Sequence, residues 1–189
     1  YGTPELTLVR GHGSRVWDVT GREYIDLLGG IAVNILGAAH PNYVQAVSDQ
    51  VGKLVHTSNL YINEPSVKLA NKLQELVGWT GAKVFFCNSG AEANEAALKL
   101  SRLTGKTQVV VVEGSFHGRT MGSLSLTAQP AKQKPFEPLL NDVTVVAIND
   151  LEALKMAITS ATAAVFLEVI QGEAGVRSLS SEFIRSARE

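Results

Sequence analysis

Continuous apolar runs dominate the chain from Ala82 onward. Four runs that are almost free of polar residues lie at residues 84–87, 109–112, 143–148 and 163–167. Runs of this kind are typical of strands that are buried on both faces of a sheet. Helical spacing of apolar residues follows the first run at about residues 91–103 and precedes the last at about residues 150–158. The pattern predicts right-handed βαβ units, and therefore an α/β fold with a mainly parallel sheet and flanking helices.

The first half of the chain has a different pattern. Short β-favouring runs alternate with turn residues over residues 6–27, which predicts a small antiparallel meander. Two connecting helices are predicted to open near Pro41 and Pro65, because proline favours the first turn of a helix. We therefore expect a small α+β segment over residues 1–63 and the first part of a larger domain over residues 64–189. A last helical pattern begins at Ser181 and reaches the end of the chain, so we expect that larger domain to be truncated.

The composition narrows the classes of function. A formal net charge of -1, without any Lys/Arg cluster, argues against nucleic-acid binding and favours small-molecule partners. The single cysteine, Cys87, excludes an internal disulfide and fits a reducing cytoplasm. We expect no metal, because the histidines are far apart and lack ligand spacing. The chain begins without signal-peptide features and has no apolar run near about 20 residues, so we expect a soluble protein with no membrane span.

The candidate chemistry lies in the loops that follow the predicted strands, where open parallel sheets bind their ligands. In the first loop, Ser89 and Gly90 lead directly into a helix, whose free N–H groups and positive dipole end form a potential anion site. The alternative is structural, since Ser89 and Glu92 have the spacing of a capping box. One turn further, Glu95 and Lys99 have the spacing of an ordinary ion pair on a helix surface.

The second loop contributes an aromatic ring and a guanidinium group. Taken alone, Phe116 is typical of a core aromatic and Arg119 of a solvated charge. Next to an anion site, the two side chains together suggest a planar ligand that is stacked and a carboxylate that is bound by both guanidinium arms. Two carboxylates, Glu168 and Glu173, follow the last predicted strand and can contact a cationic ring or an arginine.

Three motifs in this order are similar to those of the class III pyridoxal-phosphate-dependent aminotransferases, and most similar to the acetylornithine branch. They are FCNSGAEANEAALK at residues 86–99, FHGRT at 116–120 and EVIQGEAGV at 168–176. The likeness extends to residues 21–26 and 38–41. It implies the large domain of a fold type I pyridoxal phosphate (PLP) enzyme with a small N-terminal segment, and a homodimer for the complete protein.

The resemblance also implies a role for individual residues. The cofactor phosphate is expected to be held by Ser89, Gly90 and Ala91. Phe116 is expected to stack on the pyridine ring and Arg119 to bind a substrate carboxylate. Glu173 corresponds to a family glutamate that pairs with a second substrate-binding arginine, which this chain lacks, and Glu168 opens the motif in a supporting role.

The expected activity of the complete protein is amino-group transfer from N-acetylornithine to 2-oxoglutarate, a step of arginine biosynthesis. Gly30 stands where ornithine aminotransferases have a tyrosine for the free α-amino group, which leaves room for an acylated amine. Other ω-amino acid aminotransferases, acting on ornithine, succinylornithine or 4-aminobutyrate, are the alternative, as is a non-catalytic domain that binds a phosphorylated ligand or is completed by a partner. No catalytic residue is expected within this chain, since none of its lysines has the context of the family's Schiff-base lysine and the aspartate for the pyridine nitrogen is missing. This chain alone is therefore predicted to be inactive.

Overall fold

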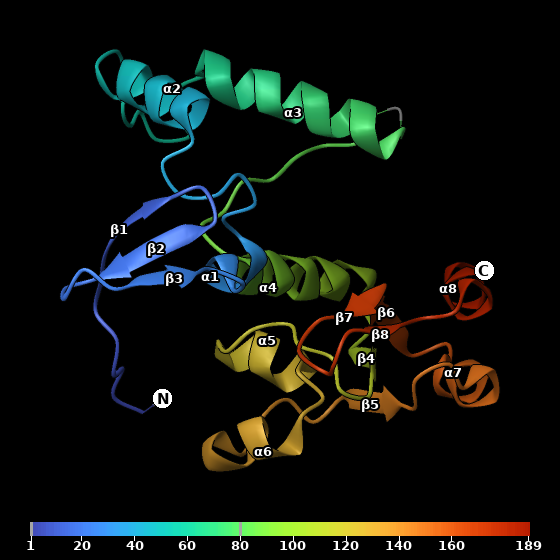
Figure 1. Cartoon of the computed structure of the whole chain (residues 1–189). Helices are drawn as coiled ribbons and strands as arrows, with labels where there is room; N and C mark the ends of the chain where they lie inside the picture. The colour runs from blue at the N-terminus through green and yellow to red at the C-terminus, as the bar shows by residue number, and fades with distance from the viewer. Residues whose placement is uncertain (1, 80) are drawn as a thin grey trace. The chain divides into compact units, whose positions relative to one another are not determined.

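A computed structural model describes residues 2–79 and 81–189, and the chain divides into two compact units (Figure 1). The first unit ends at Lys83 and the second comprises Val84–Glu189. By its contacts, the helix that opens near Pro65 belongs to the first unit. The domain boundary at residues 63 and 64 thus differs from the division by contacts, and it remains a prediction about the complete protein. None of the helices in the described part of the chain is long and apolar enough to cross a membrane.

The first unit contains the predicted meander. Its strands are β1 (Leu8–His12), β2 (Arg15–Asp18) and β3 (Glu23–Ile25), which pair antiparallel in the order β1-β2-β3. Asp18 closes the meander, because its carboxylate accepts hydrogen bonds from the Thr20 hydroxyl (2.7 Å), the Tyr24 hydroxyl (2.7 Å) and the backbone N–H groups of Thr20 and Arg22. These bonds lower the pKa of Asp18 to about 2, with the Thr20 and Tyr24 hydroxyls as the largest causes.

The helices of the first unit are α1 (Gly29–Ala32), α2 (Pro41–Val51) and α3 (Glu64–Val77). The predicted starts are confirmed: Pro41 opens α2, and Asn63 caps α3 by accepting a hydrogen bond from the Ser66 backbone N–H at 3.0 Å. Gly78 ends α3 in the left-handed conformation (φ 65°). Neither α2 nor α3 has a buried residue, so their apolar faces are not covered by the described part of the chain.

The second unit is built on a parallel sheet of three strands in the order β5-β4-β6. They are β4 (Gln108–Val112), β5 (Val143–Val146) and β6 (Thr162–Phe166), and the pairs β4/β5 and β4/β6 both run parallel. The central strand β4 is buried along Val109, Val110, Val111 and Val112. Helices α4 (Gly90–Ser101), α7 (Leu151–Ala157) and α8 (Ser181–Arg188) confirm the predicted βαβ rhythm and the last helix.

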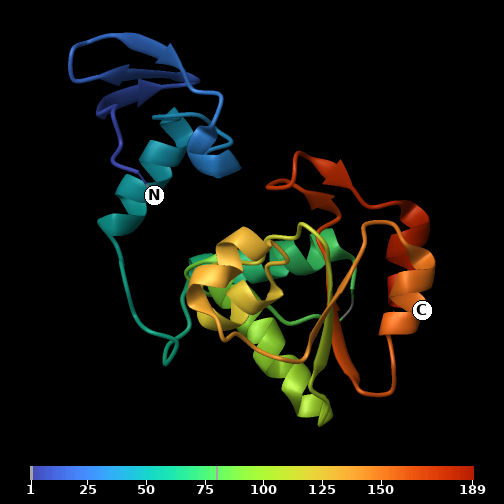
Figure 2. The same cartoon turned by 90° about the horizontal axis from the view of Figure 1, so that it is seen from below.

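The sheet has helices on both faces, which Figure 2 shows with α4 and α5 (Met121–Leu126) on one side and α7 and α8 on the other. Successive side chains of β4 alternate between two cores, as the geometry of a strand requires. One core contains Val110, Val112, Val146, Leu154, Leu179 and Phe183. The other contains Leu98, Val109, Val111, Leu126 and Ala128. Each valine of β4 therefore supports one helical layer.

The predicted strand at residues 84–87 is wrong for this chain. This segment has no strand assignment, and its Phe85 and Phe86 side chains are 70% and 41% exposed. A strand requires a neighbour that pairs with its backbone, and the described residues place none beside it. The apolar run alone could not reveal this, because it resembles the three runs that do form the sheet.

Two helices and a ribbon after the strands were not predicted. The chain after β4 forms α5, α6 (Pro130–Gln133) and a short 3₁₀ turn at Lys134–Phe136. Another 3₁₀ turn, Arg102–Thr104, follows α4. After β6, the two-residue strands β7 (Ile170–Gln171) and β8 (Arg177–Ser178) pair antiparallel. Residues after α5 and on β7 bind the loop that follows β4, where the candidate site lies.

Candidate active site

The α4 turn, residues 89–91, is the predicted phosphate site. Ser89 caps the helix, since its Oγ accepts a hydrogen bond from the Glu92 backbone N–H at 3.1 Å. The Glu92 carboxylate accepts from the N–H of Asn88 and not from that of Ser89, so only half of the expected capping box forms. The N–H groups of Gly90 and Ala91, in the first turn, have no acceptor within the helix. A Cβ built on Gly90 would meet nothing within 4 Å, so the space beside the Gly90 Cα is open.

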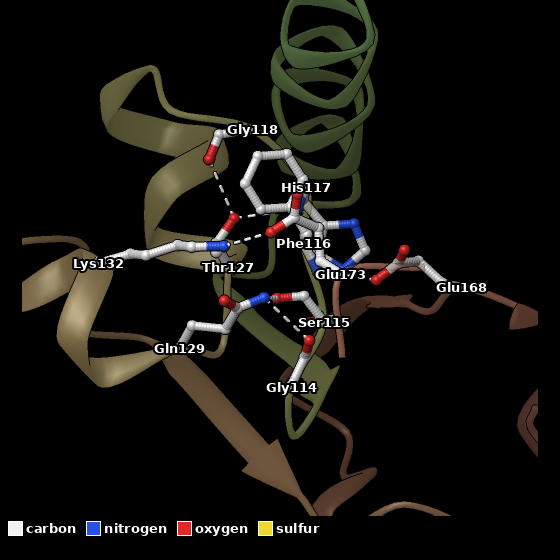
Figure 3. Close-up of polar contacts among 10 residues, drawn as sticks. All are labelled: Gly114, Ser115, Phe116, His117, Gly118, Thr127, Gln129, Lys132, Glu168 and Glu173. Carbon is white, nitrogen blue, oxygen red and sulfur yellow. Dashed lines mark hydrogen bonds and ion pairs between the residues drawn. The ribbon is translucent and has the colours of Figure 1, made fainter. Parts of the chain in front are cut away.

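The 113–120 loop, which follows β4, is held by polar side chains from later in the chain (Figure 3). Thr127 accepts a hydrogen bond from the His117 backbone N–H at 2.9 Å and donates to the Gly118 carbonyl at 3.0 Å. The Gln129 amide donates to the carbonyl oxygens of Gly114 (3.1 Å) and Ser115 (3.3 Å). These hydrogen bonds fix the backbone of the loop, and thus the points from which its side chains extend.

The β7–β8 ribbon holds the first residue of the same loop. Gln171 is fully buried, and its amide donates to the Glu113 carbonyl at 2.9 Å. Arg177 donates to the same carbonyl at 3.2 Å and to Gln171 Oε1 at 3.0 Å. The motif at residues 168–176 thus has a structural function at its glutamine, which the sequence pattern did not reveal.

The α4 turn and the 113–120 loop lie against each other. A Cβ built on Gly118 would lie 2.7 Å from the Cβ of Ala91, and Gly118 has a φ of 132° that side chains rarely adopt. Asn94 on α4 donates a hydrogen bond to the His117 carbonyl at 2.8 Å. The structure therefore brings the predicted phosphate-binding residues next to the loop that carries Phe116 and Arg119.

Two cationic side chains lie near the Phe116 ring. Lys132 Nζ lies 4.7 Å from the centre of its ring, and the Arg119 guanidinium carbon lies 5.7 Å from it. Lys132 also forms an ion pair with Glu173 at 2.6 Å. The hydrogen bond and charge of Lys132 lower the pKa of Glu173 below its ordinary value, and the Arg119 charge adds to the effect. In this chain the partner of Glu173 is therefore a lysine, and its expected pairing with an arginine stays a prediction.

Lys132 was missed in the sequence, because no motif marks it. It belongs to the short helix α6, 41 positions before Glu173 in the chain. The available signal was Pro130, which predicts that a helix opens there.

Glu168 has a definite structural role. Its Oε1 accepts a hydrogen bond from the Phe116 backbone N–H at 2.7 Å. This bond connects the segment after β6 to the loop after β4, across 52 positions of sequence. The supporting role that the resemblance implied for Glu168 thus has a geometric basis, which is to fix the backbone that carries the Phe116 ring.

His117 is the most buried ionisable group of the site. Its side chain is 6% exposed and packs edge to face against Phe166, with 5.9 Å between the ring centres. Burial lowers its pKa from 6.5 to about 4. Its Nε2 has no hydrogen-bond partner among the described residues. A neutral imidazole at this position packs as an aromatic ring.

The predicted site is an open surface of this chain. A cleft of about 530 Å³ lies behind the loop, with Gly114, Gln129 and Arg177 in its lining, but none of the predicted site residues contributes to it. Within residues 2–79 and 81–189, no three His, Cys, Asp or Glu side chains are grouped as metal ligands. The chemistry available here is anion binding by backbone N–H groups, stacking on an aromatic ring and carboxylate binding by arginine.

Comparison with known proteins defines the class to which this arrangement belongs. The family model described as aminotransferase class-III matches residues 1–189. The chain belongs to this family of PLP-dependent aminotransferases, and its second unit is part of the large domain of a fold type I PLP enzyme.

Particular relatives refine the comparison. The chain is 58% identical over 189 residues to the acetylornithine aminotransferase of Mycolicibacterium smegmatis and 52% identical over 190 residues to that of Methanopyrus kandleri. Each match covers 100% of this chain, but it covers only 48% and 49% of the relatives, respectively, so the chain spans about half of their length. Among solved structures, the N-acetylornithine aminotransferase of Stenotrophomonas maltophilia has a TM-score of 0.81 at 38% identity, with 100% of this chain and 48% of that one covered. The ornithine aminotransferase of Toxoplasma gondii has a TM-score of 0.89 at 29% identity, with 100% and 46% covered.

Proposed function

We propose that the complete protein transfers an amino group from N-acetylornithine to 2-oxoglutarate with PLP as cofactor. The observation that carries the proposal is the close approach of Gly118 to Ala91, which joins an anion-binding helix turn to a loop that presents an aromatic ring and an arginine. A phosphate, a planar ring and a carboxylate are the groups that such a site can bind, and the cofactor and substrates supply all three. The identity to acetylornithine aminotransferases supports the choice of substrate.

The residues of the α4 turn fit the phosphate of PLP. The N–H groups of Gly90 and Ala91 have no acceptor within the helix and can donate to a phosphate, and the Ser89 hydroxyl, which already accepts from Glu92, retains its own proton for a phosphate oxygen. When bound, PLP supplies the electron sink for the chemistry at the amino carbon. The part of this chain is to anchor the phosphate, to offer Phe116 to the ring and to orient a carboxylate through Arg119.

Gly30 supports an acylated substrate over free ornithine. Its backbone is left-handed (φ 64°, ψ 37°), a conformation that a tyrosine would adopt only with strain, and a Cβ built on it would meet nothing within 4 Å. The position therefore favours glycine and leaves open space. Ornithine aminotransferase is the second candidate, because a structure of that enzyme matches the fold of this chain with a TM-score of 0.89.

The substrate is tested with the complete protein by comparing kcat/KM for N-acetylornithine, succinylornithine, ornithine and 4-aminobutyrate, with 2-oxoglutarate as acceptor. We expect N-acetylornithine to give the highest value. A preference for free ornithine would support the second candidate instead.

Arg119→Lys tests the role of the loop. A guanidinium group binds a carboxylate with two parallel hydrogen bonds, which an ammonium group cannot reproduce. Hydrogen bonds to charged groups contribute about 1.5–3 kcal/mol, so we expect kcat/KM to fall roughly 10- to 100-fold in both half-reactions. Cofactor affinity, measured by absorbance titration, should change little. Arg185→Lys, at an exposed arginine of α8, is the control. Unchanged kcat/KM, or a loss confined to cofactor binding, would remove Arg119 from the substrate site.

A further inference from the structure

The Glu95 carboxylate lies at the N-terminus of helix α5. Its Oε1 accepts hydrogen bonds from the backbone N–H groups of Gly122 (2.8 Å) and Ser123 (3.0 Å) and from the Thr120 hydroxyl (2.5 Å). A Cβ built on Gly122 would overlap this carboxylate, so a side chain at position 122 would force Glu95 to move. One carboxylate oxygen on α4 therefore accepts hydrogen bonds from three donors, which lie 25 to 28 positions further along the chain.

The same face of α4 holds the other side of the loop. Ala91, Asn94 and Glu95 are spaced by three and four residues, so they lie on one face of the helix. Ala91 packs against Gly118, and Asn94 donates to the His117 carbonyl. Arg119 lies between these contacts and those of Glu95, so α4 fixes the backbone on both sides of it.

We propose that Glu95 is a positioning residue for substrate binding, which fixes the loop that presents Arg119 relative to the α4 turn that would hold the cofactor phosphate. The inference rests on the proposed function, because it requires Arg119 to bind a substrate carboxylate. Glu95 itself contacts the loop backbone and Thr120. It acts through Arg119, whose guanidinium group must be placed within a fraction of an ångström of a productive position, since a misplacement of about 1 Å can cost on the order of 100-fold in rate.

Removal of the carboxylate should displace the loop without unfolding it. Helix α5 retains its own capping box, in which the Ser123 hydroxyl accepts a hydrogen bond from the Thr120 backbone N–H at 3.1 Å. Thr127 still binds Gly118 from the other side. The substitution removes the hydrogen bonds between α4 and the start of α5, and Arg119 then loses its fixed position relative to the α4 turn.

The test is a double-mutant cycle in the complete protein with PLP bound. Glu95→Ala is made in the native background and in the Arg119→Lys background. We expect Glu95→Ala to lower kcat/KM roughly 10- to 100-fold in the native background, chiefly through KM, and less than about 3-fold in the Arg119→Lys background. Glu95→Gln retains the accepting oxygen and should restore kcat/KM to within about 3-fold of the native value. Glu152→Ala, at an exposed carboxylate of α7 that pairs with Lys155, is the matched control.

A second readout does not depend on turnover. The same cycle is applied to the dissociation constant of glutarate, an unreactive dicarboxylate, measured by calorimetry, and we expect the same coupling. If Glu95→Ala does not fold, Gly122→Ala replaces it, because the added Cβ displaces the carboxylate from the opposite side. Equal losses in both backgrounds, or a loss confined to PLP affinity, would show that Glu95 only stabilises the fold and would overturn the inference. Absence of amino transfer from all four substrates would contradict the proposed function. Coupling between Glu95 and Arg119 in glutarate binding would still support the positioning role of Glu95 in that case. If the native protein did not bind glutarate at all, the positioning role would be overturned as well.

Discussion

Burial of His117 makes the stability of this protein depend on pH in a defined window. The pKa of His117 is about 4 in the folded chain and 6.5 for an ordinary histidine, because burial disfavours the charged imidazolium. The folded state therefore resists protonation that the unfolded state accepts. The free energy of unfolding therefore keeps its full value above pH 6.5 and decreases as the pH falls toward 4. The pKa difference of 2.5 (6.5 − 4), at about 1.36 kcal/mol for each pKa unit, corresponds to roughly 3 kcal/mol.

His117→Phe isolates this effect, because phenylalanine retains an aromatic contact with Phe166 and has no titrating nitrogen. We expect the apparent free energy of unfolding of the variant, relative to the native protein, to rise by roughly 3 kcal/mol between pH 7 and pH 4. The assay is urea denaturation of the complete protein at pH 7, 6, 5 and 4. Phe166→Leu alters the same contact without removing a titratable group, so its difference from the native protein should not depend on pH.

Parallel pH curves for the native protein and His117→Phe would refute the reasoning. A direct measurement is available from the deuterium exchange of the imidazole C2 proton, followed by mass spectrometry, which reports the pKa of each histidine. A value for His117 at or above 6.5 would mean that burial does not disfavour the charged imidazolium, and it would refute the reasoning as well.

Two further predictions concern the backbone. Gly118→Ala should destabilise the protein by about 2–4 kcal/mol in denaturant unfolding, because it adds a Cβ at a φ of 132° within 2.7 Å of the Ala91 Cβ. Gly172→Ala, where a Cβ would meet nothing within 4 Å, should stay within about 0.5 kcal/mol, and equal effects at the two positions would contradict the contact between turn and loop. Asp18→Asn should accelerate amide exchange in β2 and β3 at pH 7, because Asp18, with a pKa of about 2, closes the meander as a carboxylate. In the native protein the same loosening should appear only as the pH falls from 3.8 toward 2, and unchanged exchange in the variant would refute this role of Asp18.

The strands could be predicted where burial alone decides them. The run at residues 109–112 forms the centre of the sheet, where both faces are covered and every residue is apolar. The run at residues 84–87 is equally apolar but forms no strand in this chain. The difference is in pairing, because a strand forms when a neighbouring backbone satisfies its N–H and C=O groups, and composition does not encode which neighbour is present.

The sequence predicted residues for the candidate site, and their roles toward cofactor and substrate stay predictions. Residues such as Ser89 and Phe116 follow β-like runs and belong to contiguous motifs, so the rule that ligands bind at strand ends singles them out as candidates. The residues that fix the loop, such as Thr127 and Gln171, are separated from it by about 10 to 58 positions. Their contribution depends on the folded topology, and their residue types are common on ordinary surfaces.

Glu95 shows why a local rule fails at such a position. Its spacing to Lys99 predicts an ion pair on the helix surface, yet none of the ion pairs among the described residues joins them, and the carboxylate instead binds the start of α5. An exposed pair of this kind contributes only about 0.3–0.5 kcal/mol. A buried backbone N–H group left without an acceptor costs about 1–3 kcal/mol, and Glu95 accepts from the half-buried N–H of Gly122 as well as from the N–H of Ser123, which the Thr120 side chain also binds. The contact between Glu95 and α5 is therefore worth more free energy than an ion pair with Lys99, and the spacing of residues along α4 does not reveal this difference. The same comparison of free energies should identify positioning carboxylates wherever a second helix begins beside the first.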